Sequence, residues 1–189
     1  LLLVGLGNPG SDYTNTRHNI GFKIIDAINS HFKLSKQKPK FKGLLTTGNI
    51  DEKKIYAIKP LTFMNNSGTA IKELIDYFKI DAKDVIVFHD DMDIDFGKIK
   101  AKFGGSSAGH NGIESIDKFI GKDYSRVRIG IGHPKQKKKV NNHVLEDFKE
   151  DEEERIKEIT ENIVKQIPTL IDKKMDLFSS KVNQNLNGI

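Results

Sequence analysis

Leu1-Leu-Leu-Val-Gly-Leu-Gly-Asn-Pro-Gly10 opens the chain as a short apolar strand that runs into a glycine-rich turn. The apolar residues of 18–32 then recur at helical spacing and predict an amphipathic helix. Further strand-like and helical runs alternate along the sequence, with strands at 41–50, 54–59, 85–88, 98–103 and 126–131 and helices at about 66–78 and 113–120. This alternation predicts an α/β fold, a three-layer αβα arrangement around one twisted sheet.

The two strands at 41–50 and 54–59 are separated only by Asp51-Glu-Lys53, which predicts a hairpin. A hairpin makes neighbouring strands antiparallel, so we expect a mixed sheet. The run Val85–Phe88 is continuously apolar, as is typical of a central strand covered on both faces.

The rest of the chain shows no change of composition that would divide it, so residues 1–189 are expected to form a single domain. The lysine-rich residues 33–42 are expected to be a connection. The periodicity predicts one C-terminal helix at about 152–178 with a kink at Pro168.

Composition limits the class of protein. The chain has 189 residues, no cysteine, and 31 Lys+Arg against 26 Asp+Glu, for a net charge of +5. Without cysteine there is no thiol nucleophile, disulfide or zinc-thiolate site, and a reducing compartment is expected. The apolar runs are far too short to cross a membrane. Mild basicity by itself does not indicate nucleic acid.

The first glycine-rich turn matches the dinucleotide-binding fingerprint by its letters, Gly5-x-Gly7-x-x-Gly10. The context disagrees, because a polar loop follows the glycines and no later strand ends in an acid at the required distance. A tight turn that needs positive φ is the more economical interpretation.

A second glycine-rich loop, Gly105-x-Ser107-x-Gly109, matches the nucleophile elbow of serine hydrolases. Acids and histidines lie downstream in a workable order, so a serine esterase that uses Ser107 remains open at this point. Glycines in the first turn of the following helix argue for a surface loop instead.

Four acids, Asp90, Asp91, Asp93 and Asp95, follow the predicted central strand. Ligand and catalytic groups collect at the carboxyl ends of such strands, and carboxylates could hold Mg²⁺. A solvated acidic turn is the simpler interpretation for the last three. Asp90, nearest the strand, is expected to face a site.

His18 stands where the first loop becomes a helix, and a general base needs a partner that orients its ring. Asp90 could be that partner if the first strand and the central strand are neighbours. The amides of Asn8, Asn65 and Asn111, at the ends of three other elements, could bind a developing oxyanion or a substrate N–H. Together these residues would form an acyl-transfer site.

Cations surround the second glycine loop: Arg126, Arg128, Lys102 and the run Lys135-Gln-Lys-Lys-Lys139. Such groups could form a rim that binds phosphate.

Five segments carry a resemblance: Gly5-Leu-Gly-Asn-Pro-Gly-Ser-Asp-Tyr-Thr-Asn-Thr-Arg-His-Asn-Ile-Gly21, Pro60-Leu-Thr-Phe-Met-Asn-Asn-Ser-Gly68, His89-Asp-Asp-Met-Asp93, Gly109-His-Asn-Gly112 and Arg126-Val-Arg-Ile-Gly-Ile-Gly-His-Pro134. In their order and spacing they resemble the signatures of bacterial-type peptidyl-tRNA hydrolases, over residues 1 to about 148. The loop 104–109 is less glycine-rich than in many members of that family.

The resemblance implies hydrolysis of the ester that joins a peptide, or another N-blocked amino acid, to the terminal ribose of tRNA. This reaction frees tRNA from chains released prematurely by the ribosome. By position, His18 is then the general base that activates water, and Asp90 holds and polarises it. Asn8 lies where the family distinguishes a blocked from a free amine, and Ser107 becomes a loop residue.

The remaining matched positions bind the substrate. The family places Asn65 and Asn111 on the ester and the peptide, Tyr13 and Phe63 on the tRNA end, Met64 in the lining of the pocket, His110 at the pocket rim, and Lys102 and Arg128, with Lys137, on the 5′-phosphate region. The expected partner is peptidyl-tRNA, with no metal or organic cofactor and no obligate protein partner. The protein is expected to be a cytoplasmic monomer. A noncatalytic RNA-binding homologue is the remaining alternative.

Overall fold

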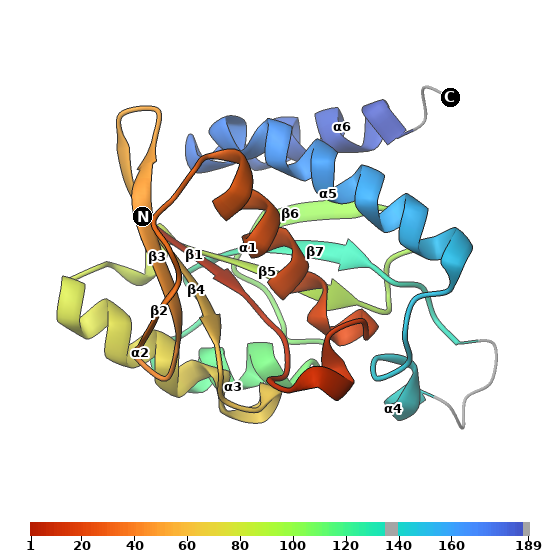
Figure 1. The fold of residues 1–189 in the computed structure, drawn as a ribbon, viewed down its shortest axis with the longest axis horizontal. Helices are drawn as coiled ribbons and strands as arrows, with labels where there is room; N and C mark the ends of the chain where they lie inside the picture. The colour runs from red at the N-terminus through yellow and green to blue at the C-terminus, as the bar shows by residue number, and fades with distance from the viewer. Residues whose placement is uncertain (135–139, 187–189) are drawn as a thin grey trace.

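The computed structural model describes residues 1–134 and 140–186, and it has one seven-stranded sheet between two layers of helices (Figure 1). The strands are β1 Leu2–Gly5, β2 Lys38–Lys40, β3 Gly43–Ile50, β4 Lys53–Pro60, β5 Val85–Asp91, β6 Ile99–Phe103 and β7 Ser125–Gly130. The α-helices are α1 Ile20–His31, α2 Ser67–Phe78, α3 Asn111–Ile120, α4 Val140–His143, α5 Glu150–Ile171 and α6 Met175–Leu186.

The sheet is mixed, as the hairpin predicted. Its strand order is β2-β3-β4-β1-β5-β7-β6. The central strands β4, β1, β5 and β7 are parallel, whereas β2, β3 and β6 join antiparallel to their neighbours. The predicted three-layer α/β fold is therefore confirmed.

Each face of the sheet has its own apolar core, because residues alternate between the faces along a strand. Leu3 and Phe88 face the layer of α1, α5 and α6, while Leu2, Val4 and Val87 face α2 and α3. The central strands are buried on both sides, which explains why they are continuously apolar in the sequence.

Residues 33–42, expected to be a connection, contain the short edge strand β2, which pairs antiparallel with β3. Its three residues, Lys38, Pro39 and Lys40, are all exposed. Lysine and proline are common on edge strands because they hinder pairing with another chain. The sequence of this strand shows no apolar alternation, so the hydropathy pattern does not indicate it.

The single C-terminal helix predicted at about 152–178 is wrong. The chain forms α5 and α6, and the break comes after Ile171 rather than at Pro168, which lies inside α5. Lys173 adopts a left-handed conformation with φ of 62° at the break. The turn brings α6 against the edge strand β6, where Asn183 bonds the Ile99 N–H and C=O and Ser179 accepts from the Ala101 N–H. Side chains of α6 thus satisfy backbone groups of an open edge.

The first glycine-rich turn owes its glycines mainly to close packing rather than to positive φ. Only Gly10 of its three glycines has positive φ, at 111°. A Cβ on Gly5 would lie 2.2 Å from the Gly21 carbonyl oxygen of α1. The turn is followed by a short 3₁₀ helix, Ser11–Tyr13, and not by an α-helix. The dinucleotide fingerprint therefore lacks its structural context.

The central strand β5 is longer than predicted, since it continues through His89, Asp90 and Asp91, all buried. β1 pairs with β4 on one side and β5 on the other, and α1 and α2 lie on opposite faces. The carboxyl ends of β1 and β5 therefore meet at a crevice of the kind in which α/β proteins bind ligands.

Among the helices of the described ranges, none combines the length and hydropathy that a membrane crossing would require.

Candidate active site

A pocket of about 170 Å³ opens at the carboxyl end of β5. Four of the residues predicted for the site line it: His18, Asp90, His110 and Asn111. His18 comes from the 3₁₀ helix η2, Arg17–Asn19, and Asp90 from β5, while His110 and Asn111 stand at the start of α3. The other walls come from the loop after β5, the loop 107–109 and Val144.

His18 and Asp90 form a buried pair. The Nδ1 atom of His18 lies 2.8 and 2.9 Å from the two carboxylate oxygens of Asp90. An ionised carboxylate only accepts hydrogen bonds, so Nδ1 carries the proton and Nε2 is left with a free lone pair. This tautomer is the one that a general base requires.

His110 is bound to the same carboxylate. Its Nε2 lies 2.9 Å from Oδ1 of Asp90, and its Nδ1 accepts from the N–H groups of Gly112 and Ile113 at 3.1 and 3.3 Å. His110 therefore caps α3 with a ring nitrogen, where helices usually have a serine, threonine or asparagine oxygen. His110 therefore lines the pocket and also belongs to the hydrogen-bond network of Asp90.

Burial by itself raises the pKa of the Asp90 carboxyl, but the rings of His18 and His110 beside it outweigh burial and hold that pKa well below its usual range. The three side chains place ligand atoms within 4.8 Å of one another, close enough for one metal ion to reach all of them. In the structure these atoms pair donor to acceptor with each other. We therefore assign them to a proton-handling network rather than to a metal site.

His89, next to this network, is buried. Its Nδ1 donates to the carbonyl of Asp90 at 2.7 Å, and its ring meets the ring of His110 edge to face at 4.9 Å. Burial, with a smaller contribution from His110, lowers the pKa of His89 to about 3. His89 is therefore neutral at physiological pH and packs against the ring of His110.

Asn8 is held by a second amide. The Asn8 N–H donates to Oδ1 of Asn19 and the Asn8 C=O accepts from Nδ2 of Asn19, at 2.8 and 2.9 Å. The side-chain Oδ1 of Asn8 accepts from the Met64 N–H at 2.8 Å, which fixes the orientation of the amide. Asn8 lines a neighbouring pocket of about 300 Å³ rather than the one around His18.

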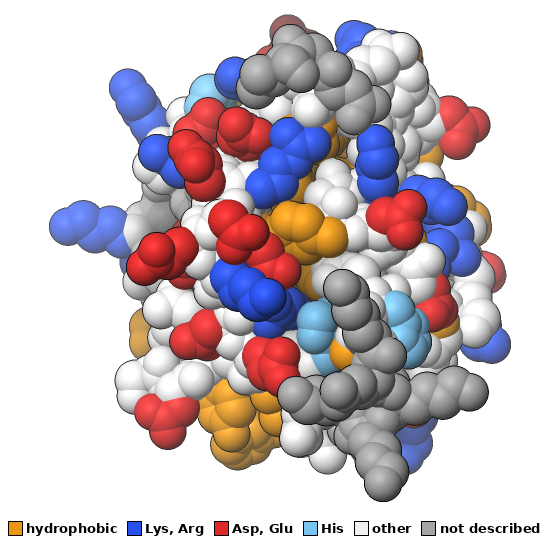
Figure 2. All heavy atoms as spheres, turned by 90° about the vertical axis from the view of Figure 1, so that its right-hand side faces the viewer, with side chains coloured by type: hydrophobic (Ala, Val, Ile, Leu, Met, Phe, Trp, Pro, Cys, Tyr) orange, Lys and Arg blue, Asp and Glu red, His pale blue; other side chains and the backbone are white. Residues whose placement is uncertain are grey.

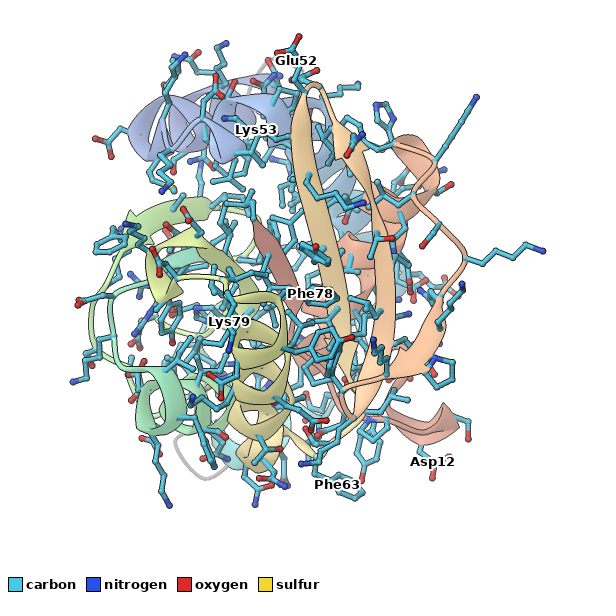
Figure 3. The ribbon with its side chains drawn as sticks, turned by 90° about the vertical axis from the view of Figure 1, so that its left-hand side faces the viewer. Asp12, Glu52, Lys53, Phe63, Phe78 and Lys79 are labelled. Carbon is cyan, nitrogen blue, oxygen red and sulfur yellow. The ribbon has the colours of Figure 1, made fainter. Side chains whose placement is uncertain are left out.

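The predicted aromatic positions form a pair at the surface. Tyr13 and Phe63 meet edge to face at 6.5 Å, and Phe63 is 60% exposed. Figure 3 shows Phe63 near the 3₁₀ helix that carries Asp12, at the end of the molecule opposite to the β3–β4 hairpin tip with Glu52 and Lys53. Asn65, in the 3₁₀ helix Met64–Asn66, is exposed at the same end, whereas Met64 is buried.

The predicted cationic residues differ in exposure: Arg128 and Lys102 are partly exposed, whereas Arg126 is buried. Arg128 donates from Nε to Oδ2 of Asp91 at 2.7 Å, and Lys102 stands on the neighbouring strand β6. Burial, with Arg128 and Arg126 nearby, lowers the pKa of Lys102. Arg126 is 1% exposed, because it bonds the Ser106 carbonyl and Asp117, so it is no part of a rim. Lys137 lies outside the described residues.

Asp91 is not a solvated turn residue, since it is buried and paired with Arg128. Asp93 and Asp95 are exposed, as the simpler interpretation predicts. Ser107 lines the pocket, but its hydroxyl donates to Glu114 at 3.3 Å, an arrangement without the histidine that a serine nucleophile needs.

Sequence reasoning missed Arg17, the residue that fixes the loop of His18. Its guanidinium is 3% exposed and bonds the carbonyls of Glu146 and Asp147 and the carboxylate of Glu152. The His18 N–H donates to the Val144 carbonyl at 2.8 Å. Backbone carbonyls of residues 144–147, after α4, thus fix the position of the loop that carries His18. The scarcity of arginine in this lysine-rich chain was the only available signal.

Comparisons with known proteins agree on one family. The family model described as peptidyl-tRNA hydrolase matches residues 2–188. A peptidyl-tRNA hydrolase of Pelagibacter ubique is 74% identical, over 97% of this chain and 98% of that protein. One from Ehrlichia ruminantium is 46% identical over 96% and 93%. The crystal structure of peptidyl-tRNA hydrolase from Acinetobacter baumannii has a TM-score of 0.90 at 34% identity, and covers 96% of this chain and 93% of its own.

Proposed function

This chain belongs to the bacterial-type peptidyl-tRNA hydrolase family and cleaves the ester bond of peptidyl-tRNA, and we propose that His18 is the base in that reaction. The Nε2 atom of His18 takes a proton from water, whose oxygen forms a bond to the ester carbonyl carbon. The bond from that carbon to the ribose oxygen then breaks, and the proton passes to the ribose. The observation that carries this proposal is the buried His18–Asp90 pair with its fixed tautomer.

Asp90 supports the base in two ways. It holds the ring so that Nε2 faces the pocket, and its negative charge stabilises the imidazolium that forms when water is deprotonated. No covalent intermediate is needed, because a ribose hydroxyl is a far better leaving group than an amine.

Asn8 distinguishes blocked from free amino groups in this proposal. Its Oδ1 accepts from the Met64 N–H, which orients the amide and leaves its Nδ2 hydrogens to be offered to a substrate. Among the described residues none accepts from Nδ2 in the structure. An N-blocked substrate carries an acyl C=O that can accept this bond. A free ammonium group has only donors, and faces Asn8 donor against donor.

The other amides and the aromatic pair hold the two ends of the substrate. Asn111 lines the pocket at the first turn of α3, where its amide and the positive end of the helix can stabilise the carbonyl oxygen. Asn65 holds the peptide backbone. Tyr13 and Phe63 offer exposed rings on which the terminal bases of tRNA can stack.

Lys102 and Arg128, joined by Lys137, bind the 5′-phosphate region of the acceptor stem. Because one chain supplies all of these groups, we propose that a monomer of one domain is the active unit and that it acts in the cytoplasm, where it returns tRNA from prematurely released chains.

The test is release of an N-acetylaminoacyl group from tRNA by the wild-type protein and by the variant His18→Ala. Loss of the base should lower kcat by roughly 10²–10⁴-fold, while tRNA binding persists. Unblocked aminoacyl-tRNA serves as the substrate control. Binding lost in His18→Ala, with turnover intact in whatever still binds, would contradict the assignment, and so would labelling of Ser107 by a fluorophosphonate.

A further inference from the structure

We propose that His110 is a positioning residue that acts on His18 through their shared carboxylate, Asp90, as a neutral imidazole locked by the start of α3. The proposal rests on the proposed function, because it requires His18 to be the base. It assigns His110 a role in positioning and adjusting the base His18, instead of a contact with the substrate.

The lock follows from hydrogen-bond chemistry. The first N–H groups of a helix have no acceptor within the helix, and those of Gly112 and Ile113 both point to Nδ1 of His110. A nitrogen that accepts two hydrogen bonds cannot carry a hydrogen, so the ring hydrogen of His110 is on Nε2 and is donated to Asp90. A second proton on His110 would face two N–H donors and would undo the cap.

The consequence for His18 follows from sharing one oxygen. Oδ1 of Asp90 accepts from Nδ1 of His18 at 2.8 Å and from Nε2 of His110 at 2.9 Å, and the two rings are 4.9 Å apart. A hydrogen bond to a carboxylate stabilises its negative charge. The N–H of His110 therefore weakens the hold of Asp90 on a protonated His18. His18 therefore passes its proton to the leaving ribose more readily.

His110 also connects the base to the start of α3. The backbone N–H of His110 donates to the Ser107 carbonyl at 2.9 Å. The next residue is Asn111, which lines the pocket. One side chain thus sets the distance between the Asp90 carboxylate and the amide proposed for the ester carbonyl.

Other titratable and charged groups lie around His18 and His110. They are His89 and Asp91 on β5, Asp93 in the next loop, Arg128 on β7, and His143 and Glu146 beside Val144. Asp91 is paired with Arg128, and His143 with Glu146. The contact that distinguishes His110 from these groups is its direct bond to the oxygen that holds His18.

Two variants separate the cap from the carboxylate bond. His110→Asn keeps an acceptor suited to an N-cap, but its side chain is too short to donate to Asp90. His110→Gln carries an N–H where Nε2 stood and can donate to Asp90, but is a poorer cap. The measurements are kcat and KM for N-acetylaminoacyl-tRNA from pH 5 to 9, with thermal unfolding of each variant.

For His110→Asn we expect kcat to fall about 10-fold, as for other supporting residues of a site, with KM within about 3-fold of wild type. The acidic limb of the pH–rate profile should move to higher pH by roughly half a unit to one unit, because Asp90 then holds protonated His18 more strongly. His110→Gln should restore the limb to its wild-type position while unfolding at a lower temperature.

An unmoved limb in His110→Asn would overturn the proposal, as would a large rise in KM, which would return His110 to a substrate contact. Variants that differ from wild type only in unfolding temperature would leave His110 a simple cap and also overturn it. A fully active His18→Ala would overturn this proposal and the proposed function together, so the two failures are distinguishable.

Discussion

Asp90 joins side chains that are far apart in the sequence: His18 lies 72 residues before it and His110 lies 20 residues after it. A buried carboxylate is costly unless hydrogen bonds satisfy it, and two ring N–H groups do so here. The same bonds fix the proton on one nitrogen of each ring. The same hydrogen bonds thus compensate the burial of the Asp90 carboxylate and set the tautomers of His18 and His110. We therefore expect few substitutions to be tolerated at these three positions.

His89 makes the stability of the protein depend on pH. Its pKa is lowered to about 3 by burial, from an ordinary 6.5, so the unfolded chain takes up a proton at a higher pH than the folded protein does. The stability that neutral His89 confers is complete above about pH 6.5 and is lost as the pH falls. Between pH 6.5 and 5 the free energy of unfolding should fall by about 2 kcal/mol on this account.

The measurement is denaturant unfolding at both pH values for wild type and for His89→Asn, whose amide can reproduce the Nδ1 bond. The variant should lose this part of the pH dependence. His31→Asn removes an exposed histidine from α1 and is the matched control, with the wild-type pH dependence expected. Parallel pH curves for wild type and His89→Asn would contradict the role given to His89.

At the scale of elements, the contact of α2 with α3 sets the distance between two parts of the site. Gly68 in α2 donates its N–H to the Ser115 hydroxyl in α3 at 2.9 Å. A Cβ on Gly68 would lie 2.2 Å from the Ser115 carbonyl oxygen. The glycine therefore allows the two helices to approach. Asn65 lies in the 3₁₀ helix just before α2 and Asn111 in the first turn of α3, so this contact sets the distance between them.

Gly68→Ala should destabilise the protein by about 1–3 kcal/mol, although alanine by itself favours a helix by roughly 1 kcal/mol. The added methyl meets backbone, which cannot rotate away, so the helices must separate. We expect kcat/KM to fall as well, since Asn111 moves with α3. Denaturant unfolding and the release assay measure the two effects.

Thr69→Ala, one residue further along α2, is the control, because the hydrogen bond that its hydroxyl donates is a local one to the Asn66 carbonyl at 3.0 Å. Its stability should stay within about 0.5 kcal/mol of wild type. If Gly68→Ala proved as stable as Thr69→Ala, the close approach of the two helices would not be what the glycine provides.

At the scale of the whole molecule, the net charge of +5 does not gather the described residues into a basic patch on the face that Figure 2 shows. Acidic and basic side chains are intermixed over the surface that Figure 2 shows. Arg126 and Arg17 are buried, and Arg128 is held by Asp91. Binding of tRNA should therefore depend on a few placed contacts and not on a general field.

The dependence of tRNA binding on salt tests this view. Three phosphate contacts, from Lys102, Arg128 and Lys137, should give a log–log slope of roughly −2 to −3. Lys102→Ala and Arg128→Ala should each reduce its magnitude by about one. Lys38→Ala, on the exposed strand β2, should leave the slope unchanged. An affinity independent of salt would mean that the cationic contacts lie elsewhere.

The sequence by itself determined the layers and the mixed sheet, since the periods of apolar residues reveal which segments are strands or helices and which face is buried. It also placed His18 and Asp90 at element ends, and their pairing was inferred on the condition that β1 and β5 are neighbours. The resemblance supplied the family. Edge strand β2 and the division between α5 and α6 were missed, because Lys-Pro-Lys shows no apolar alternation and neither glycine nor proline marks the turn after Ile171.

Only the tertiary structure decided which polar groups meet. The shared oxygen of Asp90, the lock on His110, the pairing of Asp91 with Arg128 and the anchoring of Arg17 all join residues 20 to 135 positions apart. A hydrogen bond depends on distance and direction to within a fraction of an ångström. Local periodicity fixes neither of these, because they are set only when the strands have their register and the helices have packed.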